Sequence, residues 1–292
     1  IINIPSIPAP PEIQAFDKYG KPITLNEKQL SFVRIGKSGA SAVLIGAAGT
    51  GKTTCQGTLV SELILSGQAG ILQSGGHKHL ISDTPGIVVC AFTRRAVANI
   101  RRNMPKDMQN NCITIHKLLE YQPVYYEVLT DKGETKTTMK FEPTRNARNP
   151  LPSSIHTLIF EETSMLGTDL YQEVINACPH GPQLIFLGDI QQLRPVFGPA
   201  ILGFKLLELP VTELTEVYRQ ALESPIISLA HRILSGNPLA ANEFQDWKFP
   251  NQLTIRPWKK KISAEMALNT AIMMFCGNRH TESDPAKQAK GL

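Results

Sequence analysis

Short apolar runs alternate with longer amphipathic stretches along residues 42–217. The runs have the length of strands, and their nearly continuous apolar character fits strands that are covered on both faces. The stretches between them have helical spacing. The alternation predicts an α/β fold, with a parallel sheet and helices on both faces. The predicted strands are residues 42–45, 87–92, 112–115, 157–160, 184–187 and 211–214.

Two segments interrupt this alternation. Residues 66–85 contain Gly and His and are expected to loop out. Residues 121–153 contain a β-rich run (125–130), a Gly-containing turn (131–134) and a Thr-rich run (135–141). That order predicts an inserted β-hairpin, followed by a loop over residues 143–152.

The same pattern divides the chain into parts. The Pro-rich residues 1–21 are expected to form an N-terminal arm, and residues 22–217 a first domain. Beyond Ser235 the pattern weakens, and residues 262–275 are the last helix-like run. Residues 218–292 therefore read as the start of a second, incomplete domain.

Composition excludes several classes of protein. Hydrophobic residues make up 42% of the 292 residues and charged residues 19%, which argues against a disordered or coiled-coil chain. No apolar run reaches the length of about 18 residues that a membrane span needs. The five cysteines form no CxxC pair, so a structural zinc site or a disulfide framework is not expected. We therefore expect the protein to reside in a reducing compartment. The N-terminus has no signal-peptide pattern.

Positive charge is concentrated in the middle of the chain. The net charge is 30 − 25 = +5, and residues 94–148 alone carry 11 − 6 = +5. A basic segment suits a polyanion surface. A solvated face with no partner explains the same charges equally well.

A phosphate-binding loop is the most specific motif. Residues 46–53 fit the pattern GxxxxGK[ST], after a predicted strand and before the helical run 54–65. In such a loop, backbone N–H groups cradle phosphate oxygens, the Lys side chain reaches the β- and γ-phosphates, and the last hydroxyl binds Mg²⁺. ATP and Mg²⁺ are therefore the expected cofactors. The expected nucleotide-binding residues are Gly46, Gly49, Thr50, Gly51, Lys52, Thr53 and Thr54.

A second acidic motif completes the expected site. The apolar strand 157–160 ends in Glu161 and Glu162, which is the Walker B arrangement. We assign Glu161, with Thr53, to Mg²⁺ and Glu162 to the attacking water. Two solvated carboxylates at a helix start are the alternative.

With these motifs, the chain resembles superfamily 1 helicases of the 5′-to-3′ branch, of the Dda and RecD type. The resemblance covers about residues 25–236 and implies two RecA-like domains. Residues 25–29 resemble the adenine-reading Q motif, which implies that Gln29 hydrogen-bonds the base; an Asn-capped helix start explains the same residues.

Further motifs of the family lie in the expected order. Residues 91–97 resemble motif Ia and residues 114–119 the "TIH" motif, both of which contact single-stranded DNA. Residues 188–196 resemble motif III, in which Gln192 would sense the γ-phosphate. Residues 214–220 resemble motif IV, which makes Arg219 an arginine finger. The DNA-binding residues implied by the resemblance are Phe92, Thr93, Arg94, Thr114, His116, Arg194 and Val196.

The sequence departs from the family in two ways. The metal-binding carboxylate is usually Asp, whereas position 161 is Glu, and Mg²⁺ tolerates poor octahedral geometry badly. The two late motifs of the second domain are not found, and position 1 is not Met. We therefore expect a truncated chain or one from which regions are absent.

The resemblance implies an ATP-dependent helicase that moves 5′-to-3′ on single-stranded DNA and separates a duplex fork with the hairpin. Replication or recombination proteins would be further partners, in the cytoplasm of a bacterial or phage-infected cell. A nucleotide-gated binding protein that does not unwind is the alternative, and an RNA-directed relative also stays open because the fold is shared.

Overall fold

The computed structural model describes residues 13–16, 20–70, 73–74, 78–79, 84–129, 135–196, 198–218, 225–237, 248–249 and 253–254. Its contacts divide the chain into two units, Ile1–Ala221 and Leu222–Leu292. The first unit contains the central sheet and every predicted strand. The expected domain boundary after residue 217 stays a prediction.

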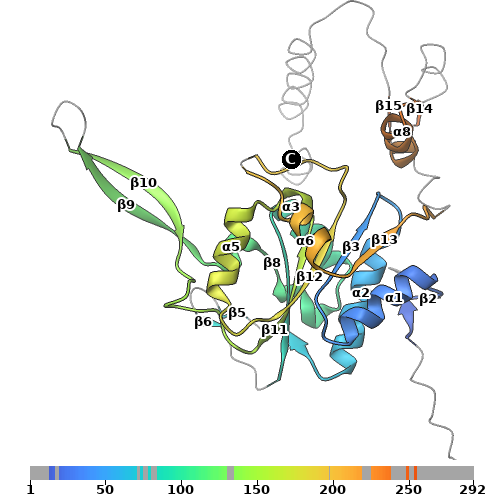
Figure 1. Ribbon diagram of the computed structural model, residues 1–292, viewed down its shortest axis with the longest axis horizontal. Coiled ribbons are helices and arrows are strands. Elements are labelled where there is room, and N and C mark those ends of the chain that lie inside the picture. Colours follow the sequence, from blue (N-terminus) through green and yellow to red (C-terminus); the bar gives the residue numbers. More distant parts are fainter. Residues whose placement is uncertain are drawn as a thin grey trace, which may run out of the picture. The chain divides into compact units, whose positions relative to one another are not determined.

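A parallel sheet of seven strands forms the centre of the first unit (Figure 1). Its order is β13-β3-β12-β11-β7-β4. The seventh strand, β8, pairs with the carboxyl-terminal half of β7. All six predicted strands are present, which confirms the predicted α/β fold class. The strands are β3 (Ala42–Gly46), β4 (Ala69–Gly70), β7 (Gly86–Ala91), β8 (Cys112–Thr114), β11 (Ile155–Glu161), β12 (Gln183–Gly188) and β13 (Val211–Leu214).

The segment expected to loop out contributes an edge strand instead. β4 pairs in parallel with the start of β7, and its Gly70 packs tightly, since a Cβ there would lie 3.2 Å from the Asp107 carbonyl oxygen. The expectation of a loop was wrong here because an Ala-Gly strand of two residues leaves no apolar run in the sequence. The same segment also contains the antiparallel pair β5 (Gln73–Ser74) and β6 (Lys78–His79).

Helices cover both faces of the sheet because neighbouring strand residues point to opposite sides. Leu44 faces one core and Val43 the other. The first core is closed by α1 (Glu27–Lys37), α2 (Lys52–Leu65), α3 (Arg94–Arg102) and the 3₁₀ segment η1 (Lys106–Asn111). The second is closed by α4 (Ile115–Leu118), α5 (Thr168–Ala177) and α6 (Ile201–Glu208).

The predicted hairpin is present, and its strands are longer than predicted. β9 (Tyr121–Leu129) pairs antiparallel with β10 (Thr135–Pro143) over nine residues, and the ribbon extends away from the sheet (Figure 1). One face carries the exposed apolar side chains of Tyr125, Leu129, Met139 and Phe141. The predicted turn over residues 131–134 lies outside the described residues.

The base of the hairpin is held by a compact set of polar contacts, which we call the hairpin root. The Arg145 guanidinium donates to both carboxylate oxygens of Glu120 at 3.0 and 3.1 Å, and both side chains are mostly buried. The Thr144 and Arg145 N–H groups donate to the Leu119 carbonyl oxygen. The Tyr121 hydroxyl donates to the Glu173 carboxylate on α5. The ribbon is thus anchored to the domain at both strands.

Short elements complete the described chain. β1 (Ala15–Phe16) pairs with β2 (Pro22–Ile23), and Ala15 is buried, so part of the expected N-terminal arm packs on the domain. The second unit contains α8 (Pro225–Leu234) and the pair β14 (Lys248–Phe249) and β15 (Leu253–Thr254). The helix-like run 262–275 lies outside the described residues. Among the described helices, none is long and apolar enough to cross a membrane.

Candidate active site

The phosphate loop joins β3 to α2, as its sequence predicts. Gly49 and Gly51 have φ angles of 84° and 92°, a left-handed conformation that favours glycine. At Gly46 a Cβ would lie 2.8 Å from the backbone oxygen of Leu214, so the close approach of β13 requires a glycine there. The loop ends at Gly51, the N-cap of α2, and Thr54 lies within the first turn of that helix. The free N–H groups and the helix dipole make this end of α2 suited to an anion.

Lys52 turns its ammonium group back onto the loop. Its Nζ donates to the carbonyl oxygens of Gly46 at 2.5 Å and Ala47 at 3.1 Å. Burial lowers the pKa of Lys52, and the nearby carboxylates of Asp189 and Glu161 oppose this shift. The carboxylates therefore offset only part of the cost of burying the Lys52 cation. A phosphate group that binds beside it would stabilise the cation further.

The acidic pair lies where β11 ends. Glu161 is the last residue of the strand, and Glu162 has φ 52° and ψ 42°, a left-handed conformation that is uncommon for a residue with a Cβ. This turn leads into the 3₁₀ segment η2 (Thr163–Met165). Strained backbone of this kind clusters at functional sites, and here it occurs at the second of two consecutive glutamates.

Thr163 and Gly188 join the end of β11 to the end of β12. The buried Thr163 hydroxyl donates to the Leu187 carbonyl oxygen at 2.9 Å. A Cβ at Gly188 would lie 2.5 Å from that hydroxyl, so the contact requires glycine. Asp189 follows directly, buried, and accepts from the Gln191 N–H. Sequence reasoning assigned no role to Thr163, which directly follows the acidic motif, or to Asp189, which lies inside motif III.

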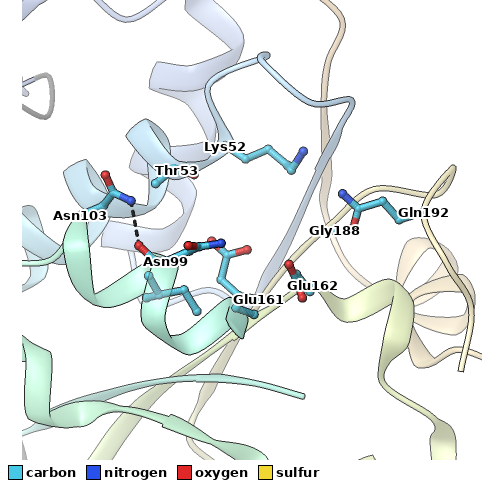
Figure 2. A pocket seen from close by; sticks show the side chains of 10 residues that line it. Lys52, Thr53, Asn99, Asn103, Glu161, Glu162, Gly188 and Gln192 are labelled. Atoms are coloured by element: carbon cyan, nitrogen blue, oxygen red, sulfur yellow. Dashed lines mark hydrogen bonds between the residues drawn. The ribbon is translucent and has the colours of Figure 1, made fainter. Parts of the chain in front are cut away.

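One pocket gathers the predicted residues from separate elements (Figure 2). Lys52 and Thr53 come from the start of α2, the acidic pair from the end of β11, and Gln192 from the loop after β12. The α3 helix forms the remaining wall, which sequence reasoning did not foresee. The signal available in the sequence was the spacing of three to four residues between positions 96, 99, 100 and 103, because residues so spaced share a helix face. The lining residues of α3 and its C-cap are Ala96, Asn99, Ile100 and Asn103.

Among the residues that line this pocket, Glu161 has the most strongly shifted pKa. Burial raises the pKa of Glu161 to about 7, while the Lys52 ammonium and the Glu162 N–H partly offset this. A carboxylate in such surroundings is a suitable partner for a cation. No group of three or more acidic, His or Cys side chains able to hold a metal occurs in the described part of the chain. Mg²⁺ at nucleotide sites needs fewer, since phosphates and water supply the other ligands, so Thr53 and Glu161 fit it.

The raised pKa of Glu161 gives a prediction for the protein without nucleotide. Because the folded state favours the protonated carboxyl, the cost of this residue to stability grows as the pH rises from 4.5 to about 7, is full above 7, and is small below 4.5. Glu161→Gln should therefore raise the thermal unfolding temperature at pH 8, with at most about 3 kcal/mol gained. The gain should fade toward pH 5. Thermal denaturation across pH measures this, with the exposed Glu127→Gln as the control; a pH-independent difference would contradict it.

Gln29 lies behind the phosphate loop, and its side chain is 1% exposed. Asn26 is the N-cap of α1, and the two residues form a reciprocal capping box, so the Asn-cap alternative is present in the structure. The Gln29 amide also contacts Thr50 of the loop and Tyr218. Its expected role as a base reader stays a prediction.

Four of the seven predicted DNA-contacting residues lie at the carboxyl ends of β7 and β8, namely Phe92, Thr93, Thr114 and His116. The rings of Phe92 and His116 lie 5.5 Å apart and edge-to-face, and His116 lies 4.9 Å from Tyr121 of the hairpin. Burial lowers the pKa of His116, and the nearby Glu173 carboxylate opposes this shift. The hydroxyls of Thr93 and Thr114 cap α3 and α4. Both therefore have a structural role whether or not they also contact DNA.

The remaining predicted residues are more scattered. Arg94 is exposed at the start of α3, and Arg194 and Val196 are exposed on the loop after β12. None of the three lines the pocket. Arg219, the predicted arginine finger, lies outside the described residues.

Comparison with known proteins adds to this geometry. A protein-family model described as an AAA domain matches residues 30–198. The ATP-dependent RecD2 DNA helicase of Deinococcus radiodurans is 30% identical over 216 residues, which cover 73% of this chain and 24% of that protein. The ATP-dependent DNA helicase dda of Enterobacteria phage T4 is 28% identical over 198 residues, which cover 65% of this chain and 37% of that protein.

A solved structure supports the fold. The crystal structure of Pif1 helicase from Candida albicans has a TM-score of 0.52 at 20% identity and covers 90% of this chain and 56% of that one. The resemblance to helicases of the Dda and RecD type that the motifs predict is confirmed by the curated relatives. The chain spans about a quarter to a third of the length of those relatives.

Proposed function

Because this chain belongs to the family of AAA domains, we propose that it hydrolyses ATP and uses the energy to move along single-stranded DNA. The observation that carries this proposal is the pocket, in which Lys52, Thr53, Glu161, Glu162 and Gln192 meet from three different parts of the sheet edge. The RecD2 and dda relatives are named as ATP-dependent DNA helicases. ATP is accordingly the proposed substrate.

Each pocket residue has a proposed role. Lys52 leaves the carbonyl oxygens of the loop and binds the β- and γ-phosphates. Glu162 orients a water molecule and accepts its proton as the γ-phosphate is attacked. Gln192 contacts the γ-phosphate from the loop that continues to Arg194, which links the nucleotide to the proposed DNA-facing residues.

Thr53 and Glu161 would hold Mg²⁺, which would neutralise the phosphate charge that develops during hydrolysis. The longer Glu side chain still reaches the pocket, because Glu161 lines it beside Thr53. Asn99 lies on the wall next to Glu161 (Figure 2) and offers an amide to water around the metal.

Single-stranded DNA is the proposed partner. The aromatic group of Phe92, His116 and Tyr121 offers surfaces on which bases stack. Arg94 and Arg194 are exposed and would contact phosphates, which makes binding salt-dependent and tolerant of sequence. Movement in the 5′-to-3′ direction and separation of a duplex fork by the hairpin are part of the same proposal.

We also propose how the chain is divided into domains. Residues 22–217 form the first RecA-like ATPase domain, with the hairpin inserted at 121–153, and residues 218–292 begin a second one that would supply Arg219 as an arginine finger. Two RecA-like domains closing on ATP would drive stepping.

Steady-state ATP hydrolysis with and without single-stranded DNA tests the proposal, alongside strand separation of a forked duplex with a 5′ tail. We expect DNA to stimulate hydrolysis and the fork to be separated. Binding of both ligands without stimulation would instead favour the nucleotide-gated binding protein, for which the Glu at position 161 is the supporting observation. Stronger stimulation by RNA would favour an RNA-directed relative.

The hairpin root gives a separate prediction about unwinding. Arg145→Ala removes the paired bonds to Glu120 and the bonds to Asn149 and Pro150, so the ribbon loses its fixed direction. We expect DNA-stimulated hydrolysis to persist while the rate of strand separation falls about tenfold or more, since small misplacements of positioning groups are costly. Arg148→Ala, an exposed arginine in the same loop, is the matched control. An equal loss of hydrolysis and unwinding would contradict the assignment of the hairpin.

A further inference from the structure

Thr163 links two strand ends that both lead into the pocket. It directly follows Glu162 at the end of β11, and its hydroxyl donates to the Leu187 carbonyl oxygen on β12 at 2.9 Å. The residue is buried, with 0% of its surface exposed. Thr163 does not line the pocket itself. Any effect of its hydroxyl on a bound nucleotide must therefore pass through its neighbours.

The backbone just before Thr163 depends on contacts that hold it. Glu162 has φ 52° and ψ 42°, a left-handed conformation that is unfavourable with a Cβ and persists only where the surroundings fix it. The Met165 N–H donates to the Glu162 carbonyl oxygen at 3.0 Å, and the Leu166 N–H donates to that of Thr163 at 3.2 Å. Both bonds lie within the turn. The Thr163 hydroxyl, by contrast, ties the turn to another strand.

The acceptor of this bond lies just before the loop that carries Gln192. At Gly188, the residue after Leu187, a Cβ would lie 2.5 Å from the Thr163 hydroxyl. The end of β12 thus contacts the threonine side chain at two consecutive residues. The following turn is closed by the Gln192 N–H, which donates to the Asp189 carbonyl oxygen at 3.1 Å. The hydroxyl bond therefore joins the turn of Glu162 to the strand that leads directly to the turn of Gln192.

Such a link matters for the hydrolysis proposed above. A general base works only within hydrogen-bonding reach of the proton that it accepts. In the proposed reaction Glu162 activates a water molecule next to the γ-phosphate that Gln192 contacts, so the two side chains must keep a fixed separation. Small displacements of such groups cost large factors in rate.

We propose that Thr163 is a positioning residue for ATP hydrolysis, because its hydroxyl fixes the Glu162 turn against the strand that leads to Gln192. It acts on the chemical step through Glu162 and does not contribute to nucleotide binding. This inference rests on the proposed function, since it concerns the reaction in the same pocket.

Thr163→Val tests the inference, because valine nearly keeps the shape of the side chain and lacks the hydroxyl. We expect ATP turnover at saturating single-stranded DNA to fall about tenfold, since the base is displaced. The KM for ATP, and the dissociation constant of ADP with Mg²⁺ from calorimetric titration, should change by less than about twofold, as expected when only the chemical step is affected. Thr163→Ser keeps the donor and should retain most of the turnover.

Thr157→Val is the matched control, because it removes a buried threonine hydroxyl from the opposite end of the same strand. The Thr157 hydroxyl lies 3.0 and 2.9 Å from the side-chain oxygens of Gln68 and Gln183. We expect this variant to lower the thermal unfolding temperature as Thr163→Val does and to leave turnover unchanged. Equal loss of turnover in both variants would overturn the inference, because general destabilisation would then explain it.

The Glu162→Gln background gives a readout that a merely structural role would not move. A chain without the base has no proton acceptor to position, so adding Thr163→Val should lower its remaining turnover by less than about twofold. The full loss in this background would overturn the inference, as would a Thr163→Ser variant as slow as Thr163→Val. Normal turnover in Thr163→Val would overturn the inference alone, whereas an unmodified chain that binds ADP but does not hydrolyse ATP with DNA would overturn the proposed function as well.

Discussion

Lys52→Ala is expected to lower ATP turnover by a factor on the order of 10²–10³, the usual cost of removing one charged group that stabilises a transition state. The residue lies at the first turn of α2, and its ammonium group is held 2.5 Å from the Gly46 carbonyl oxygen, within the curve that phosphates would occupy. Burial lowers the pKa of Lys52, and the carboxylates of Asp189 and Glu161 oppose this shift by stabilising the cation. Steady-state hydrolysis at saturating DNA measures the loss.

The matched control is Lys106→Ala, which removes the same charge from an exposed position in η1. This variant should hydrolyse ATP at the normal rate. Thermal denaturation of both variants checks that the fold is kept. If Lys52→Ala retains turnover, the phosphate loop is not the site of hydrolysis.

Glu162→Gln should slow ATP hydrolysis while leaving nucleotide binding nearly unchanged. The amide has the shape of the carboxylate but cannot accept a proton, so we expect turnover to fall about 10²–10⁴-fold with little change in nucleotide affinity. Glu161→Gln should differ, because it removes a metal-binding charge and should weaken Mg²⁺-dependent nucleotide binding. Single-turnover hydrolysis and nucleotide titration together distinguish the two.

Glu127→Gln on the exposed hairpin is the control for both carboxylate variants. The left-handed backbone at position 162 accommodates Gln as it does Glu, so the comparison does not depend on a change of fold. Loss of nucleotide affinity in Glu162→Gln equal to that in Glu161→Gln would mean that the roles of the two carboxylates are not divided as proposed.

The central sheet could be predicted because its signal is local. Runs such as residues 157–160 are apolar and short, and each coincides with a strand whose ends lie within two residues of the predicted ones. β4 could not be predicted, since its two residues form a strand only because the edge of β7 offers free hydrogen-bonding groups. Pairing of that kind depends on tertiary contacts, which leave no periodic pattern.

The motifs in the sequence predicted that a pocket forms and which motif residues line it. They did not predict every residue of its wall. Lys52, Glu162 and Gln192 lie far apart in sequence, yet each follows a strand of one parallel sheet, so their meeting follows from the topology. The contribution of α3 depends on how that helix rotates against the sheet. The burial of Gln29 depends on Tyr218, 189 residues away, which no local pattern connects to it.

The hairpin also has a mechanical consequence. Nine paired residues at about 3.3 Å each make a ribbon about 30 Å long. A sideways force on the tip of such an arm is multiplied by its length at the pivot, where the Glu120–Arg145 pair and the Tyr121–Glu173 bond lie. The torque that an obstacle applies to the tip is therefore delivered to α5 and to the ends of β7 and β8. A load on the ribbon thus enters the domain on the face covered by α4 and α5, opposite the helices α2 and α3 that line the pocket.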